Sequence, residues 1–522
     1  MSKHESDGSS HPVCSRRVFL EKTLVGAASV ARGIGYSARP IGIAMLNAAT
    51  VTAADDLANL QMHEAATLVR QKKVSSVQLT QACIARIEAL NPRLNAFITV
   101  TAESALAQAR QAEAELQRGI WRGPLHGIPI ALKDLVDTAG VRTTGGSALF
   151  KDRVPREDAA VVQRLRDGGA VFLGKLNMYE VAFGPTTKET SFFGRVANPW
   201  AIEHISGGSS SGSGAAVAAG LCFAALGSDT GGSIRQPSAF CGVVGLMPSY
   251  GRVSTRGAIP LSWSADYLGP ITRSVVDAAL MLRAIAGYDP KEVTSYDMPV
   301  DDYAAGLRQS RKGRMRIGLA QNPFFEALDP QIRQSVDRAV AVFAKLGAEI
   351  YEVALPESSH RPVLQAEVHA YHAAHMTATP ELYLPATLSK LRLGANIDME
   401  TYIKAKLSLD QLRRTAPTVF RNTDAVLTPT TPVPPPRASE LPSTFDDVMA
   451  LDAVLFRNTR PFNLLAFPTI SIPCGFTDLG LPIGLQLSGA PWQELQLLQI
   501  AHAYEQVTNW HTRRPTITAG AP

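Results

Sequence analysis

Cysteine is scarce in this chain of 522 residues, which has only Cys14, Cys83, Cys222, Cys241 and Cys474. No two of them have the CxxC spacing of a zinc or redox site, and so few scattered cysteines cannot build a disulfide framework. We therefore expect most of them to be small buried side chains. A content of 45% hydrophobic and 19% charged residues also excludes a disordered or collagen-like chain.

Neither sign of charge is in large excess. The net charge is +5, and residues 1–53 supply much of it, with six Lys or Arg against three acidic residues. The rest of the chain has 45 basic and 43 acidic residues and no Lys/Arg block of the density that binds nucleic acid. Nucleic acid is therefore not expected as a partner.

The first 53 residues have the layout of an export signal. Residues 15–22 (SRRVFLEK) resemble the bacterial twin-arginine motif, with Glu21 inserted before the usual basic position. The apolar stretches that follow are interrupted by arginines and fall short of the ~20 residues of a membrane span. We expect a cleaved signal peptide over 1–53, the twin-arginine translocation machinery as a partner, and a periplasmic or secreted protein. The cleavage point stays open, and a disordered basic tail on a cytosolic enzyme is the alternative.

Helical and strand-like segments alternate along the rest of the chain. The spacing of apolar residues predicts helices within 64–116, with a break at Asn91-Pro92, and at 331–346 and 492–506, and strands at 128–132, 170–173, 315–319, 349–353, 469–472 and 484–487. The proline-rich stretch 428–436 is interpreted as an extended surface connection inside one domain. The alternation predicts one large α/β domain over 54–522, with helices on both faces of its sheet.

A tract of nine Gly or Ser residues, 206–214, is followed directly by an Ala-rich, helix-like run over 215–226. Taken alone the tract is typical of a flexible linker, but glycines before a helix let backbone N–H groups approach a ligand. The tract contains a G-x-S-x-G pattern centred on Ser210, which is the motif of the α/β-hydrolase nucleophile. That match is weak because any Gly/Ser tract generates it and no apolar strand precedes it.

Two further segments have the residue types of a catalytic site. The turn 227–237 (GSDTGGSIRQP) places two glycines directly before Ser233, which favours several N–H groups pointing the same way, as in an oxyanion hole. Asp229 and Arg235 lie six residues apart across the turn and could pair. Lys133 closes an apolar strand; such a lysine is usually solvated, but if buried it could act as a base with a lowered pKa.

Together these segments resemble the amidase signature family. The Gly/Ser tract follows Lys133 by about 76 positions, and the Gly-Gly-Ser-Ile-Arg turn follows 24 positions later. The resemblance is dense over about 123–290, where it includes 174–178 (GKLNM) and 198–200 (NPW), and it persists with lower density over nearly the whole mature chain. It implies a single domain with a mixed central sheet.

The resemblance also implies roles for individual residues. Ser233 would be the nucleophile that forms an acyl-enzyme, Lys133 the base, and Ser209 the relay between them, following a cis Gly208–Ser209 bond. The oxyanion would be held by backbone N–H groups, and three further residues would support the site. The oxyanion donors would be Thr230, Gly231, Gly232 and Ser233, and the supporting residues Ser228, Asp229 and Arg235.

The function implied is that of an acylamide amidohydrolase. It would cleave the C–N bond of a small-molecule amide and release an acid plus ammonia or an amine, with no cofactor and no metal. His369, His372 and His375 lack the four-residue spacing of helical zinc pairs. Two alternatives stay open: a glutaminase subunit of an aminoacyl-tRNA amidotransferase, and an esterase or carbamate hydrolase on the same site. A homodimer is compatible with the sequence, which does not set the oligomeric state.

Overall fold

A mixed β-sheet of eleven strands forms the centre of the molecule. The computed structural model describes residues 54–309, 313–321, 323–357 and 360–517. The strands are arranged in the order β1-β3-β2-β6-β8-β7-β12-β13-β11-β9-β10. Their bounds are β1 Phe97–Val100, β2 Pro129–Lys133, β3 Val171–Leu176, β6 Ala224–Asp229, β7 Val244–Met247, β8 Tyr267–Thr272, β9 Arg316–Ala320, β10 Glu349–Val353, β11 Ala425–Pro429, β12 Thr469–Phe476 and β13 Pro482–Ser488. A separate pair contains β4 (Ala197–Asn198) and β5 (Ala201–Ile205).

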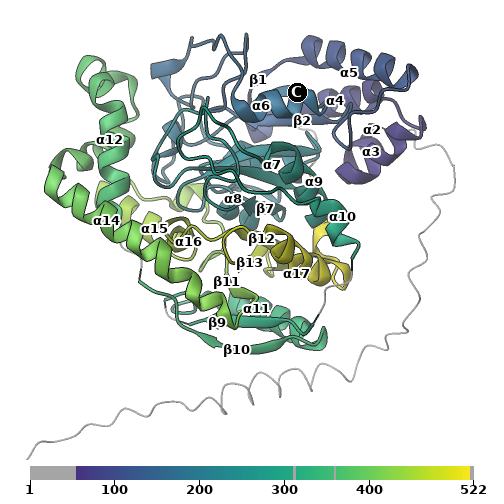
Figure 1. Ribbon diagram of the computed structural model, residues 1–522. Coiled ribbons are helices and arrows are strands. Elements are labelled where there is room, and N and C mark those ends of the chain that lie inside the picture. Colours follow the sequence, from purple (N-terminus) through teal and green to yellow (C-terminus); the bar gives the residue numbers. More distant parts are fainter. Residues whose placement is uncertain (1–53, 310–312, 322, 358–359, 518–522) are drawn as a thin grey trace, which may run out of the picture.

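Helices cover both faces of the sheet and extend beyond it on one side (Figure 1). There α12 packs against α13 and α14, and α14 against α16. The helices are α2 Ala54–Asn59, α3 Met62–Arg70, α4 Ser76–Leu94, α5 Ala102–Gln117, α6 Ala160–Asp167, α7 Ser211–Ala218, α8 Arg235–Cys241, α9 Val275–Ile285, α10 Tyr303–Leu307, α11 Pro330–Lys345, α12 Arg361–Ala378, α13 Pro385–Arg392, α14 Met399–Thr415, α15 Phe445–Leu455, α16 Arg460–Leu465 and α17 Glu494–Gln506. The predicted single α/β domain is confirmed.

Most segments predicted from the periodicity are present, but three local predictions were wrong. Helix α4 continues through Pro92 to Leu94. It ends at Asn95, which adopts the left-handed conformation typical of a helix C-cap. The helix-like run after the Gly/Ser tract is divided, with α7 ending at Ala218 and strand β6 beginning at Ala224. Small alanines fit a buried strand as well as a buried helix, so their apolar character does not separate the two.

The third error is the proline-rich stretch, which is not a surface connection. Its first residues belong to β11, and residues 425–432 are buried throughout. Strand β11 pairs with both β13 and β9, so the first residues of the stretch lie inside the sheet. No domain boundary occurs at this stretch. Cys83, Cys222, Cys241 and Cys474 are free and buried, as expected. The predicted signal peptide and Cys14 lie outside the described residues, among which no helix is long and apolar enough to cross a membrane.

Candidate active site

Lys133 is the last residue of β2. Strand β2 runs parallel to β6, and the carboxyl ends of parallel neighbours meet at one edge of a sheet, so Lys133 lies beside Ser228 near the end of β6. The lysine side chain is fully buried. Its Nζ donates hydrogen bonds to Ser209 Oγ at 2.7 Å and to Ser228 Oγ at 2.8 Å. Among the described residues, hydroxyl groups therefore surround the amine and no carboxylate touches it.

The environment of Lys133 favours an uncharged amine. Burial lowers the pKa of its ammonium from 10.5 to about 7, although the negative charges of Asp229 and Asp266 raise it in part. A second fully buried lysine, Lys175, is bonded instead to Thr138, Thr143 and the Val136 carbonyl. Lys133 is thus the buried lysine that contacts the predicted relay serine, Ser209, and near neutral pH a large share of it can accept a proton.

Ser209 follows a cis peptide bond, Gly208–Ser209. The backbone on both sides is held, since Gly208 N donates to Gln236 Oε1 at 2.8 Å and Tyr179 N donates to Ser209 O at 3.0 Å. A side chain at position 208 would approach the Tyr179 ring to within 2.5 Å, so only glycine fits there. This packing fixes the Ser209 hydroxyl between Lys133 on one side and an open cavity on the other.

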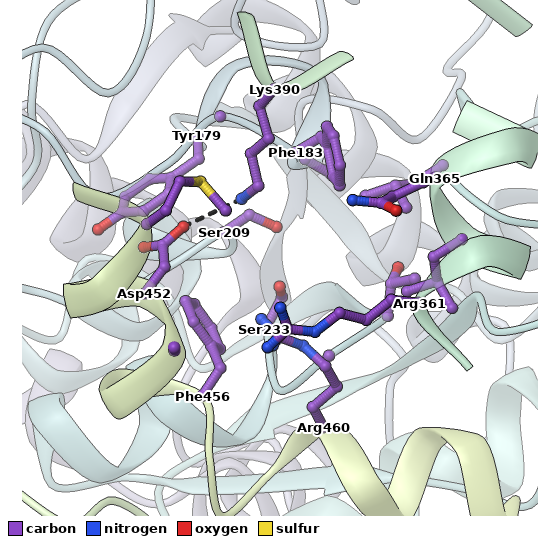
Figure 2. Close-up of a pocket in the computed structure, with 18 of the residues that line it drawn as sticks. Tyr179, Phe183, Ser209, Ser233, Arg361, Gln365, Lys390, Asp452, Phe456 and Arg460 are labelled. Carbon is purple, nitrogen blue, oxygen red and sulfur yellow. Dashed lines mark hydrogen bonds and ion pairs between the residues drawn. The ribbon is translucent and has the colours of Figure 1, made fainter. Parts of the chain in front are cut away.

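Ser209 and Ser233 both line a cavity of about 370 Å³. Figure 2 shows the two side chains facing this cavity from different loops. Among the described residues, no hydrogen bond joins Ser209 Oγ to Ser233 Oγ, while Ser210 N donates to Ser233 O at 3.2 Å and ties the two loops together. Hydrogen bonds between catalytic groups often tighten only when substrate is bound, so this arrangement is compatible with a relay.

Ser210, the central residue of the G-x-S-x-G pattern, is placed differently. It is fully buried and does not line the cavity. Its hydroxyl donates to Ser228 O at 3.1 Å and accepts from Ser228 N at 3.3 Å, so it crosslinks the Gly/Ser tract to β6. This arrangement gives Ser210 a structural role and leaves Ser209 and Ser233 as the serines of these two loops that line the cavity.

Three residues of the turn 230–233 line the cavity, namely Thr230, Gly231 and Ser233. The Gly232 amide donates to Asp229 Oδ1 at 2.6 Å, whereas the amides of Thr230, Gly231 and Ser233 have no acceptor among the described residues. Gly232 has φ +128°, and a Cβ there would lie 2.1 Å from Thr459 Oγ1. The turn therefore needs glycine at 232. The other three amides have no acceptor in the described part of the chain, so they are available to an oxyanion.

A buried ion pair holds this turn in place. Arg235 bonds Asp229 through Nε to Oδ2 and through Nη2 to Oδ1, both at 3.0 Å, which is the pairing expected from the sequence. Burial alone would raise the pKa of Asp229, but the Arg235 charge and its hydrogen bonds lower it overall. Asn463 extends the network, donating to Asp229 Oδ1 at 2.8 Å and accepting from Arg235 Nη2 at 2.6 Å. These contacts join the turn to α16.

Several site residues have no motif in the sequence. Asp266 is partly buried, accepts from Thr230 Oγ1 at 2.6 Å, and has its pKa raised to about 6 by desolvation. The far wall of the cavity comes from α12, α13, α15 and α16, and includes Arg361, Lys390, Asp452 and Arg460. Sequence reasoning missed these four wall residues because they lie more than 100 positions beyond Ser233. Within the described residues, no group of three or more His, Cys, Asp or Glu is arranged to hold a metal ion.

Comparisons with known proteins agree with this geometry. A sequence model of the Amidase family matches residues 78–498. The glutamyl-tRNA(Gln) amidotransferase A subunit of Moorella thermoacetica is 42% identical over 490 residues, covering 88% of this chain and 99% of the relative. The corresponding protein of Geotalea daltonii is 41% identical over 491 residues, with 88% and 100% covered.

Solved structures give the same result. The native peptide amidase from Stenotrophomonas maltophilia superposes with a TM-score of 0.75 at 33% identity, covering 88% of this chain and 99% of that one. A 6-aminohexanoate cyclic dimer hydrolase superposes with a TM-score of 0.79 at 29% identity, with the same coverage. The chain therefore belongs to the Amidase family, as an amide-cleaving hydrolase of the amidase signature type.

Proposed function

We propose that this protein hydrolyses carboxylic amides through an acyl-enzyme on Ser233, with Lys133 as the base and Ser209 as the relay. The observation that carries the proposal is the buried Lys133 amine, which donates to Ser209 Oγ at 2.7 Å and has its pKa lowered to about 7. A neutral amine in that position can take the Ser209 proton while Ser209 takes the proton of Ser233.

The reaction then follows from the placement of these groups. Ser233 Oγ attacks the amide carbonyl, and the developing oxyanion is held by the free amides of the turn 230–233. The C–N bond breaks as the Lys133 ammonium returns a proton through Ser209 to the departing nitrogen, which leaves as ammonia or an amine. Water attacks the resulting ester with the same base, and its hydrolysis releases the acid and restores Ser233. Ser228 and the Asp229–Arg235 pair support the site.

Hydrolysis is tested by measuring acid and ammonia release from primary amides with the purified enzyme. We expect turnover in the native enzyme, together with fluorophosphonate labelling at Ser233. Ser233→Ala should lose both while its thermal unfolding stays close to that of the native enzyme. Turnover that persists in Ser233→Ala would contradict the acyl-enzyme. Matched esters and carbamates measured alongside the amides identify the preferred leaving group.

A glutaminase component of an amidotransferase is the second candidate, and the identity of 41–42% to the A subunits of two such enzymes favours it. Glutamine hydrolysis would use the same serine and the same base, so the two candidates differ in substrate and partner. The test compares glutamine with simple amides, with and without the other subunits of an amidotransferase. Ammonia release from glutamine that depends on those subunits supports the glutaminase, whereas efficient hydrolysis of simple amides by the isolated chain supports the amidase.

Export is proposed from the sequence of residues 1–53 alone. The twin-arginine pattern at 15–22 supports delivery of the folded protein to the periplasm by the twin-arginine translocation machinery. The test replaces Arg16 and Arg17 by Lys and follows the protein by cell fractionation and N-terminal sequencing. We expect a shortened periplasmic form for the native sequence and cytoplasmic retention for the double variant. A native protein of full length in the cytoplasm would contradict the proposal.

A further inference from the structure

Two arginines from separate helices face the catalytic cavity. Arg361 is the first residue of α12 and Arg460 the first residue of α16, and both line the cavity that contains Ser209 and Ser233. Figure 2 shows both guanidinium groups directed toward the Ser233 end of the cavity. A Cβ added at Gly231 would lie 3.5 Å from Arg460 Nε, which places this guanidinium beside the oxyanion turn.

Neither guanidinium has a direct polar partner in the described part of the chain. Among these residues, neither side chain forms an ion pair or a hydrogen bond, and Arg460 instead lies over the Phe456 ring, at 5.8 Å from its centroid. Arg361 lies at the exposed rim and Arg460 is half-buried. Burial lowers the pKa of Arg460; the negative charge of Asp452 raises it in part, and the positive charge of Arg361, which repels Arg460 across the cavity, lowers it further.

The other charged groups of the cavity are already satisfied. Lys390 Nζ pairs with Asp452 Oδ2 at 3.0 Å, and Asp452 Oδ1 accepts from Thr186 N. Arg457 donates to Asn458 Oδ1 and to the Glu326 carbonyl. Burial and the charge of Arg413 lower the pKa of His360, which therefore adds little positive charge at neutral pH. The cavity thus has an excess of positive charge. Among the described residues that line it, no carboxylate balances that excess.

We propose that Arg361 and Arg460 bind a carboxylate of the substrate, so that the preferred substrate is an anionic amide. The proposal rests on the proposed function, because it takes Ser233 as the nucleophile. A guanidinium offers several N–H donors to a carboxylate, and two of them converging on one group give both affinity and orientation.

The position of Arg460 limits where that carboxylate lies. Since Arg460 Nε is close to Gly231 of the oxyanion turn, the carboxylate must be only a few atoms from the scissile carbonyl. The cavity of about 370 Å³ suits a small molecule of this kind. A cationic amino group would find no unpaired carboxylate among the described residues of the cavity, because Asp452 is already paired with Lys390. An ω-amide of a small dicarboxylate therefore fits better than a zwitterionic amino-acid amide.

The test compares glutaramate, an anionic ω-amide, with the neutral pentanamide and with glutamine. We expect kcat/KM of the native enzyme to be highest for glutaramate. Arg361→Gln and Arg460→Gln should each lower kcat/KM for glutaramate by about 10- to 100-fold, mainly through KM, and reduce the ratio of glutaramate to pentanamide. Arg414→Gln, which removes a charge from an exposed position on α14, is the matched control and should keep both values.

Binding gives a second readout that needs no turnover. Glutarate should raise the Tm of Ser233→Ala, and the shift should disappear when Arg361→Gln or Arg460→Gln is added. Equal rates for glutaramate and pentanamide, or an equal loss of both in the arginine variants, would overturn the carboxylate site. If Ser233 resists the fluorophosphonate and no amide is hydrolysed, the proposed function fails. Normal labelling with no preference for the anion refutes the carboxylate site alone.

Discussion

The burial of Lys133 predicts the pH dependence of acylation. Its pKa is lowered from 10.5 to about 7, and only the neutral amine can take the Ser209 proton. The neutral fraction is about 9% at pH 6 and about 91% at pH 8, so kcat/KM should rise roughly tenfold between them and then level off. A solvated lysine would give a rate that still increases above pH 9.

The measurement is kcat/KM for pentanamide from pH 5 to pH 10, since this neutral substrate does not titrate. Asp266 is a second group that titrates in this range, since desolvation raises its pKa to about 6. Its negative charge raises the pKa of Lys133, so Asp266→Asn should shift the midpoint to lower pH. Asp478→Asn removes an exposed carboxylate outside the cavity and should leave the midpoint in place.

Two results would refute this reasoning. A rate that falls between pH 6 and pH 8, or a midpoint near 10, would mean that the Lys133 ammonium stays charged and cannot be the base. Loss of the ionisation in Asp266→Asn would mean that the carboxyl group titrates and the amine does not.

Three further predictions concern the turns of the site. Ser210→Ala should keep fluorophosphonate labelling of Ser233 but lower the free energy of unfolding by about 1–3 kcal/mol, because two buried hydrogen bonds are lost; labelling at Ser210 itself would contradict this. Gly232→Ala should lower kcat, and it should lower Tm far more than Gly231→Ala does, because only at position 232 does the added Cβ clash with a neighbouring side chain at a positive φ. Equal Tm values for the two variants would contradict the described conformation of the turn. Arg235→Met should cost about 3–5 kcal/mol in urea unfolding, and a loss below about 1 kcal/mol would show that the buried carboxylate needs no partner.

Local sequence signals located the strands that carry the site but not their neighbours. Apolar runs predicted β2 and β3 to within a few residues, because a buried strand needs little besides continuous apolar character. The same reasoning misplaced the end of α7 and assigned the last two residues of β11 to a surface connection. Both errors concern segments whose burial depends on partner strands distant in sequence, and such partners leave no local periodicity.

The sequence by itself determined the composition of the catalytic segments. The Gly/Ser tract and the turn 227–237 are recognisable because closely spaced glycines and serines build tight turns that present backbone donors. Lys133 is recognisable by its position at the end of an apolar strand. Only the tertiary structure decided which serines face the cavity, that Lys133 is fully buried, and that Arg361 and Arg460 meet beside Ser233. Charge and burial at a site are set by groups that the fold collects from distant segments, and a pKa depends on that complete surrounding rather than on neighbours in the chain.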